Sequence, residues 1–290
     1  MFGECHAHLI MDGENYRKAV AVHENGVRED VIRRWLEIYQ RKGVSFIRDG
    51  GDALGVSERA REIAKGYGMD YRTPIFAIHK EGHYGKIVGR GFQDLKEYAL
   101  LVKEVKRHGG DFIKIMLTGI VDFRTVGVLT SSPLSRGEIH EMIHIAHEEG
   151  FAVMGHVNGD ETVKIAAEEG IDSVEHGNYI GEEAIEAMRQ NHTIWVPTVA
   201  TVKDLEGSGR YDDGVIREIY AIQSDRIKKA WDLGVTLAIG SDAGAYRVFH
   251  GEGICDEWRC FQEIIGEEKE EMKKRLQDSE EEVRKRFRTS

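Results

Sequence analysis

The sequence predicts an α/β protein built as one (β/α)8 TIM barrel, and three observations predict it. Helical segments end in glycine and lead directly into short apolar runs, as in RKGVSFI at 41–47 and DLGVTLAIGSD at 232–242. A glycine just past a helix end, followed by an apolar run, is typical of a tight turn into a buried parallel strand. Eight strands are expected in all, and several are followed by long polar loops rich in glycine. This asymmetry is typical of a barrel whose site lies at the carboxyl ends of the strands.

The elements follow one another in a regular order. The eight strands are expected at 3–8, 44–49, 72–79, 112–117, 151–156, 171–176, 193–198 and 235–240. The long loops after strands are expected at 9–27, 80–92, 118–134, 200–214 and 243–254. A doubly wound open sheet is the alternative, but it usually has a GxGxxG motif after its first strand, where this sequence has HAHL.

The rest of the chain is expected to belong to the same domain, which spans residues 1–290. Beyond residue 254 the chain is expected to be helical. The segment 267–288 is so rich in Glu, Lys and Arg that an extra C-terminal helix on the surface, without a function, is expected there.

Composition favours a cytoplasmic protein whose partner is a small molecule. The 290 residues include 40 Lys and Arg against 51 Asp and Glu, a net charge of -11. Nucleic acid and anionic membranes need clustered basic side chains, so neither is expected as a partner, whereas a homo-oligomer stays open. The chain has no run of about 18 apolar residues, and its first residues lack the pattern of a signal peptide. The cysteines, expected to be reduced and structural, are Cys5, Cys255 and Cys260.

Side chains that bind metals stand at the expected carboxyl ends of five strands. In ECHAHLI at 4–10, His6 and His8 are two residues apart and share one face of the strand, while Cys5 faces the other way. The candidates on the other four strands are Lys114, His156, His176 and Asp242. A single histidine is more often a hydrogen-bonded core residue. The strand ends of a barrel converge on one mouth, however, and four histidines with a carboxylate there suit Zn²⁺.

Lys114 does not fit a metal centre by itself, because an ammonium group is repelled by a divalent ion and cannot coordinate it. Five motifs of the chain resolve this difficulty through a resemblance: HAH, FIKIMLTG, GHVNG, IDSVEHGN and GSDAG. In this order they resemble the amidohydrolase superfamily, in its branch of imidazolonepropionase-like and prolidase-like metal-dependent hydrolases. The resemblance runs from Cys5 to about Gly253.

The resemblance implies a binuclear metal centre. Two divalent ions, expected to be Zn²⁺, would be bridged by a lysine carboxylated with CO₂. Carried over by position, one ion is bound by His6, His8 and Asp242, the other by His156 and His176, and both by the carbamate of Lys114. The implied reaction is hydrolysis of an amide C–N bond by a metal-bridging hydroxide, with Asp242 as the general base and catalytic residue.

Two features depart from the pattern of the family. Many relatives have a small β-sandwich domain, but only a few residues precede His6, so a member without that domain is expected. Asn158 stands where prolidase-like relatives often have a second histidine. This departure weakens any transfer of their dipeptide specificity to this chain.

Substrate contacts are expected from the long loops. The segment KEGHYGK resembles a loop of prolidase-like members, so His83 and Tyr84 are the first candidates to bind a substrate carbonyl or carboxylate, followed by His79. Further candidates to pair with an anionic substrate are Arg124, Tyr179, Arg247 and His250. The helix 135–149 is expected on the outside of the barrel, so its three histidines are read as surface residues: His140, His144 and His147.

The expected substrate is a small amide such as an N-acyl amino acid, a dipeptide or a cyclic amide. The same centre is chemically able to hydrolyse a lactone, an ester or an organophosphate, and loop residues decide between these substrates. A non-catalytic metal-binding homologue is a further alternative, but it would have lost the base or the bridge, and both Asp242 and Lys114 are present. Metal-dependent deamination generally uses one metal and does not need a bridging lysine.

Overall fold

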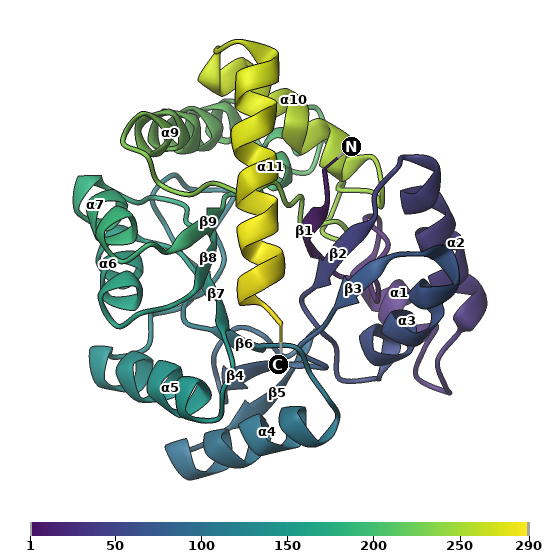
Figure 1. The fold of residues 1–290 in the computed structure, drawn as a ribbon. Helices are drawn as coiled ribbons and strands as arrows, with labels where there is room; N and C mark the ends of the chain where they lie inside the picture. The colour runs from purple at the N-terminus through teal and green to yellow at the C-terminus, as the bar shows by residue number, and fades with distance from the viewer. Residues whose placement is uncertain (1, 289–290) are drawn as a thin grey trace.

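The computed structural model describes residues 2–288 and has the predicted TIM barrel fold, with its parallel strands in two sheets (Figure 1). The first sheet has the order β1 (Glu4–Ala7), β2 (Phe46–Asp49), β3 (Asp70–Arg72). The second sheet has the order β5 (Gly89–Phe92), β4 (Ala77–Lys80), β6 (Ile113–Met116), β7 (Val153–Val157), β8 (Ser173–His176), β9 (Ile194–Val196).

The segment 236–243 connects the two sheets in the place of the eighth strand. Leu237 forms an isolated parallel bridge with Trp195 of β9, and Ala243 forms one with Ala7 of β1. The prediction of a regular strand at 235–240 is therefore wrong in detail, because this segment forms no regular ladder with its neighbours. The segment lies between β9 and β1 as expected, but only isolated bridges join it to them.

The third predicted strand, 72–79, is divided by a bend at Pro74 and Ile75. Pro74 has no amide hydrogen to donate to a neighbouring strand. Ile75 adopts a left-handed backbone conformation with φ of 68°, which interrupts an extended chain. Two short strands, β3 and β4, therefore replace the single predicted one, and they belong to different sheets.

Strand β5 lies inside the segment 80–92, which the sequence predicted to be a loop. It runs parallel to β4, with Gly89 opposite Ala77. A Cβ atom on Gly89 would lie 2.5 Å from the carbonyl oxygen of Ala77, so only glycine permits this close approach. The connection between β4 and β5, which carries Tyr84, is consequently anchored at both ends.

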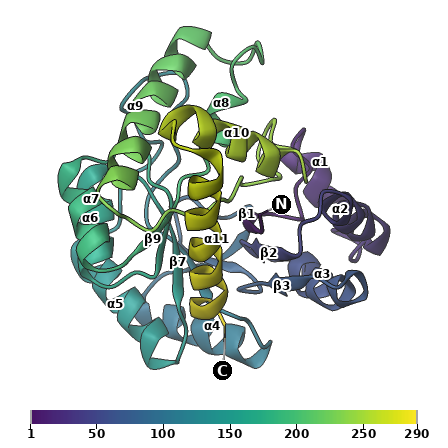
Figure 2. The same cartoon turned by 45° about the horizontal axis from the view of Figure 1, so that its top comes forward.

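Helices surround the barrel (Figure 1). Those before the last helix are α1 (Tyr16–Ala21), α2 (Glu29–Arg41), α3 (Val56–Ala64), α4 (Leu95–Arg107), α5 (Arg136–Glu148), α6 (Asp160–Glu168), α7 (Glu182–Gln190), α8 (Ala200–Lys203), α9 (Asp213–Asp232), α10 (Gly253–Ile265) and a 3-10 turn, η1 (Lys65–Tyr67). Helix α5 begins with a capping box between Ser135 and Glu138, which satisfies its first amide groups. Helices α8, α9 and α10 lie together at the side that comes forward in Figure 2.

Helix α11 (Lys269–Arg286) crosses the amino-terminal end of the barrel (Figures 1 and 2). The expectation of a surface helix without a function is only partly right, because one apolar face at helical spacing is buried: Met272, Leu276 and Val283. Phe287 follows the helix, is fully buried, and has its ring centroid 5.5 Å from that of Phe112. The helix therefore closes the end of the barrel opposite the predicted site.

Three other expectations concern single side chains and membrane contact. Cys5, Cys255 and Cys260 form no disulfide, as predicted. The three histidines of α5 lie on the outside of the barrel and have partly exposed side chains, as predicted. Within residues 2–288 there is no helix with the length and apolar character needed to cross a bilayer.

Candidate metal centre

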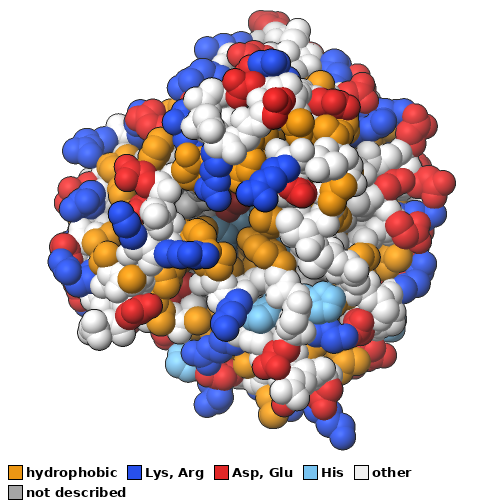
Figure 3. Space-filling model, turned by 180° about the vertical axis from the view of Figure 1, so that it is seen from behind, with side chains coloured by type: hydrophobic (Ala, Val, Ile, Leu, Met, Phe, Trp, Pro, Cys, Tyr) orange, Lys and Arg blue, Asp and Glu red, His pale blue; other side chains and the backbone are white. Residues whose placement is uncertain are grey.

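The carboxyl ends of the strands open into a cavity of about 560 Å³. The face opposite α11 is hollowed near its middle (Figure 3). All six residues predicted as metal ligands line this cavity: His6, His8, Lys114, His156, His176 and Asp242. The structure therefore brings together side chains from five different parts of the barrel.

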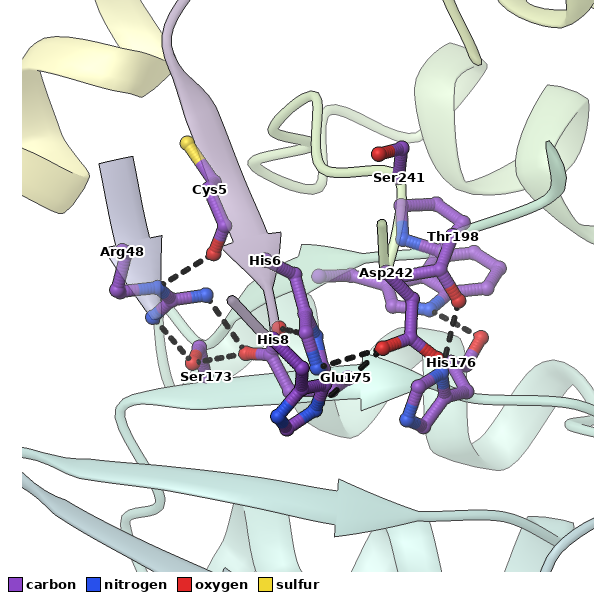
Figure 4. Close-up of polar contacts among 12 residues, drawn as sticks. Cys5, His6, His8, Arg48, Ser173, Glu175, His176, Thr198, Ser241 and Asp242 are labelled. Atoms are coloured by element: carbon purple, nitrogen blue, oxygen red, sulfur yellow. Dashed lines mark hydrogen bonds and ion pairs between the residues drawn. The ribbon is translucent and has the colours of Figure 1, made fainter. Parts of the chain in front are cut away.

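His6, His8 and Asp242 form the tightest group (Figure 4). Each residue offers one ligand atom, and the three atoms lie within 4.8 Å of one another. The Nε2 atoms of His6 and His8 are each 3.4 Å from Oδ1 of Asp242. Gly50 makes room for His8, because a Cβ atom at this position would lie 2.2 Å from Cε1 of the His8 ring.

His156 and His176 lie beside this group. Their ring centroids are 4.6 Å apart, and the ring of His176 is 5.1 Å from that of His6. Nδ1 of His176 forms a hydrogen bond of 2.7 Å with the hydroxyl of Thr198, which orients the ring. His176 and Asp242 both have left-handed backbone conformations, with φ of 68° and 60°. Such strain in residues other than glycine is concentrated at functional sites.

An inner network beneath the histidines orients His6 (Figure 4). We give this name to Arg48, Ser173 and Glu175, which are all fully buried inside the barrel. Nδ1 of His6 donates to Glu175 Oε2 at 2.7 Å, and Nη2 of Arg48 donates to Glu175 Oε1 at 2.8 Å. Arg48 also donates to the hydroxyl of Ser173 and to the carbonyl of Cys5. With Nδ1 occupied in this way, Nε2 of His6 is the nitrogen left to bind a metal.

Three polar atoms of the centre are buried without any hydrogen-bond partner: Nε2 of His6, Nδ1 of His8 and Nζ of Lys114. Buried polar atoms are normally paired in folded proteins. All three side chains line one cavity, together with a carboxylate and two more histidines. This donor set fits divalent metal ions such as Zn²⁺, which accept nitrogen and oxygen ligands.

Burial sets the protonation of the centre. It lowers the pKa of His8 and of His156 to about 3 and that of the other two histidines well below 6.5, with the charge of Lys114 adding to the effect. Burial also lowers the pKa of Lys114 and raises that of Asp242. Neutral imidazoles are the form that binds metals. A neutral lysine amine is the form that reacts with CO₂.

One of the three predicted substrate contacts reaches the cavity. Tyr84 lines it, and its ring centroid is 4.9 Å from that of His156. His79 does not line it and instead forms a hydrogen bond of 3.0 Å with the carbonyl of Lys80 through Nδ1. His83 also lies outside the lining of the cavity.

The other loop residues considered for anion binding have different surroundings. His250 is buried, with ring nitrogens 3.1 Å from the Tyr39 hydroxyl and 2.8 Å from the carbonyl of Met11. Arg247 donates to the carbonyl of Asp204. Neither of these residues lines the cavity, and the same holds for Arg124 and Tyr179.

Some residues that line the cavity were not identified from the sequence: Met11, Arg17, Phe123, Leu205, Arg210, Tyr211 and Tyr246. They lie in the segments 9–27, 118–134, 200–214 and 243–254, which were recognised as long loops on this face. The length and position of the loops indicated that they would supply contacts. Nothing in their sequence indicated which side chains point inward.

Comparison with protein families decides the family of the chain. The model described as "Amidohydrolase family" matches residues 6–278. The chain belongs to this family. The resemblance predicted from the five motifs is thereby confirmed.

Relatives of this amidohydrolase include proteins of bacteria and fungi. An uncharacterised protein of Mycobacterium tuberculosis is 31% identical over 179 residues, which cover 59% of this chain and 47% of that protein. Ochratoxinase of Aspergillus niger is 28% identical over 275 residues, which cover 82% of this chain and 56% of that protein. The chain thus spans about half the length of the curated relatives that it matches.

Solved structures show the same fold. A Xaa-Pro dipeptidase with bound methionine in the active site has a TM-score of 0.74 and 22% identity, covering 99% of this chain and 74% of that one. The structure of A. niger ochratoxinase has a TM-score of 0.73 and 18% identity, covering 92% of this chain and 67% of that one. The amidohydrolase therefore shares its barrel with these proteins.

Proposed function

We propose that this amidohydrolase hydrolyses the amide C–N bond of a small substrate at a centre of two divalent metal ions, expected to be Zn²⁺. The observation that carries the proposal is the group of buried nitrogen atoms without partners that line one cavity. Six candidate donor residues line this cavity, more than the four ligands that one tetrahedral zinc ion uses. The names of similar proteins, which include a Xaa-Pro dipeptidase and phenylurea hydrolase B, agree with chemistry at C–N bonds.

The ligands divide into two sets and a bridge. One ion would be held by His6, His8 and Asp242, whose ligand atoms are already close together. The other would be held by His156 and His176, whose rings are adjacent. Lys114 would bridge them as a carbamate formed with CO₂, which turns a buried amine into an anionic oxygen donor. The lowered pKa of Lys114 supports this role, because the neutral amine is the reactive form.

When bound, the two ions would polarise the substrate carbonyl and lower the pKa of a water molecule to about 7. Asp242 then accepts a proton from the attacking water and passes it to the departing nitrogen, as a C–O bond forms and the C–N bond breaks. Tyr84 stands next to His156, and burial raises its pKa, so its hydroxyl stays protonated and can donate to the substrate carbonyl oxygen. We therefore assign proton transfer to Asp242 and orientation of the substrate carbonyl to Tyr84.

The test is a substrate screen with metal-loaded protein. The protein is purified without chelator, supplied with Zn²⁺ and bicarbonate, and tested on N-acyl amino acids, dipeptides, cyclic amides, lactones, esters and organophosphates. We expect turnover of at least one amide class and its loss after chelation. Turnover restricted to lactones, esters or organophosphates, or no turnover at all, would contradict the proposal.

A further inference from the structure

One side of the cavity is apolar and aromatic. Five of its residues come from three loops on the face of the site and belong to one apolar cluster: Val121, Phe123, Leu205, Tyr211 and Tyr246. The ring centroids of Phe123 and Tyr211 are 5.6 Å apart. We call these five residues the aromatic wall. An apolar group of a substrate that lies against it is removed from water, which favours binding.

Arg210 lies at the aromatic wall and also lines the cavity. Its guanidinium carbon is 4.7 Å from the ring centroid of Tyr246 and 5.3 Å from that of Tyr211. No carboxylate of residues 2–288 forms an ion pair with it. Cation–π contacts with two rings hold the guanidinium group at the wall, and its N–H groups match the geometry of a carboxylate ligand.

The charges around the cavity favour an anionic ligand. Outside the metal centre, the positively charged lining residues are Arg17 and Arg210. The lining carboxylates are Asp242 of the metal centre and Glu14. Lys and Arg side chains gather around the hollow in Figure 3, although the whole chain has a net charge of -11. The mouth of the cavity therefore attracts an anion more than the rest of the surface does.

We propose that the substrate is an amide that carries both a carboxylate and a large apolar group, with Arg210 binding the carboxylate. The apolar group lies against the aromatic wall, beside Arg210, and the amide lies at the metal centre, which the same cavity contains. This inference rests on the proposed function of the same cavity. It narrows the substrate class to N-acyl amino acids with large apolar groups. A cavity of about 560 Å³ is large enough for such a molecule.

The kinetic test compares two amides that differ only in the carboxylate group, N-benzoyl-L-phenylalanine and N-benzoylphenethylamine, which lacks it. For the wild-type protein we expect kcat/KM to be at least about tenfold higher for the acid, because a charged hydrogen-bonded pair is formed. Arg210→Ala is expected to reduce the ratio of acid to neutral amide about tenfold, mainly through KM, and Arg210→Lys to retain part of it.

The matched control is Arg217→Ala. Arg217 is an arginine of α9 with 61% of its side chain exposed, and it pairs with Glu206 outside the lining of the cavity. This variant should keep the wild-type ratio. Equal ratios in Arg210→Ala and in the control would overturn the inference.

A binding measurement separates recognition from catalysis. N-benzenesulfonyl-L-phenylalanine carries the same carboxylate and apolar groups but no hydrolysable amide, and its binding is measured by calorimetry. We expect Arg210→Ala, and not Arg217→Ala, to weaken binding about tenfold. If the wild-type protein hydrolyses neither amide, the proposed function fails for this class, and the calorimetry still decides the inference. Equal binding by both variants, or no binding by the wild type, would overturn it.

Discussion

The two polar layers inside the barrel differ in how completely they are hydrogen bonded. In the inner network, near α11, Arg48 donates to three different acceptors. Glu175 accepts from the side chains of His6, Arg48 and Ser173. In the layer above, at the cavity, the side chains of His8 and Lys114 contain buried atoms without any partner. The same barrel therefore contains one saturated polar layer and one unsaturated layer.

This difference separates structural from functional polar groups. A buried donor or acceptor without a partner costs about 1–3 kcal/mol of stability, so an unsaturated layer indicates a ligand that completes it. The inner network needs no ligand. Its hydrogen bond to His6 holds that imidazole ring in a fixed orientation in the layer above. Changes in the upper layer should therefore act on metal binding and turnover, and changes in the inner network on stability, with an effect on metal binding only through the contact of Glu175 with His6.

The largest effect is expected from Lys114→Ala. The variant removes the proposed bridge and should lose most of its metal and activity, with partial rescue by added short carboxylates that replace the carbamate. Metal analysis and kinetics with and without propionate measure this. Two retained metal ions and full turnover without rescue would show that Lys114 is no bridge.

The next largest effect is expected from Asp242→Asn. The change keeps the size and one oxygen ligand but removes the proton acceptor, so turnover should fall by about 10²–10⁴-fold. The histidines and Lys114 should still hold most of the metal. Metal content and steady-state kinetics are measured on the same preparation. An unchanged kcat would exclude Asp242 from proton transfer, and loss of both ions would show that it acts chiefly as a ligand.

Arg48→Met tests the saturated layer. The change leaves Glu175 buried without its cation, which should lower the free energy of unfolding by about 3–5 kcal/mol. Urea unfolding of metal-free protein measures the loss without a contribution from metal binding. The double variant Arg48→Met/Glu175→Gln is the control and should lose less, because no unpaired charge remains. A loss below about 1 kcal/mol in the single variant would contradict a structural role of the pair.

Glu175→Gln tests the connection between the layers and should have a smaller effect on metal binding than the change at Lys114. A neutral amide still fits the space but is a weaker acceptor for Nδ1 of His6. Metal affinity, measured by competition with a chelator, should fall about 10–100-fold. Gln190→Ala, on the outer helix α7, is the control and should keep wild-type affinity. Equal affinities in the two variants would show that the inner network does not position His6.

Much of the barrel could be predicted because its signals are local. Glycine after a helix and a short apolar run mark several strands independently, and the strands from β6 to β9 lie within the predicted ranges or extend one residue beyond them. The split of the third strand had a signal in Pro74, which a central strand rarely contains. Strand β5 had none, because GRGF resembles a loop and is a strand only through its close approach to Ala77.

The candidate site could be predicted only where strand periodicity determines direction. His6 lies in β1 and His8 directly follows it, and the side chains of both line the same cavity as the other proposed ligands. The inner network joins Arg48 to Glu175 across 127 positions, and no local pattern relates these residues. Loop side chains such as Arg210 line the cavity because different loops pack against one another, which the sequence does not show.

The number of metal ions per chain tests the central claim most directly. Protein purified without chelator is loaded with Zn²⁺ in the presence of bicarbonate, freed from excess metal, and measured by elemental analysis against protein concentration. The unsaturated layer with its six candidate donors predicts about two ions per chain. One ion or fewer per chain in fully loaded protein would contradict a binuclear centre.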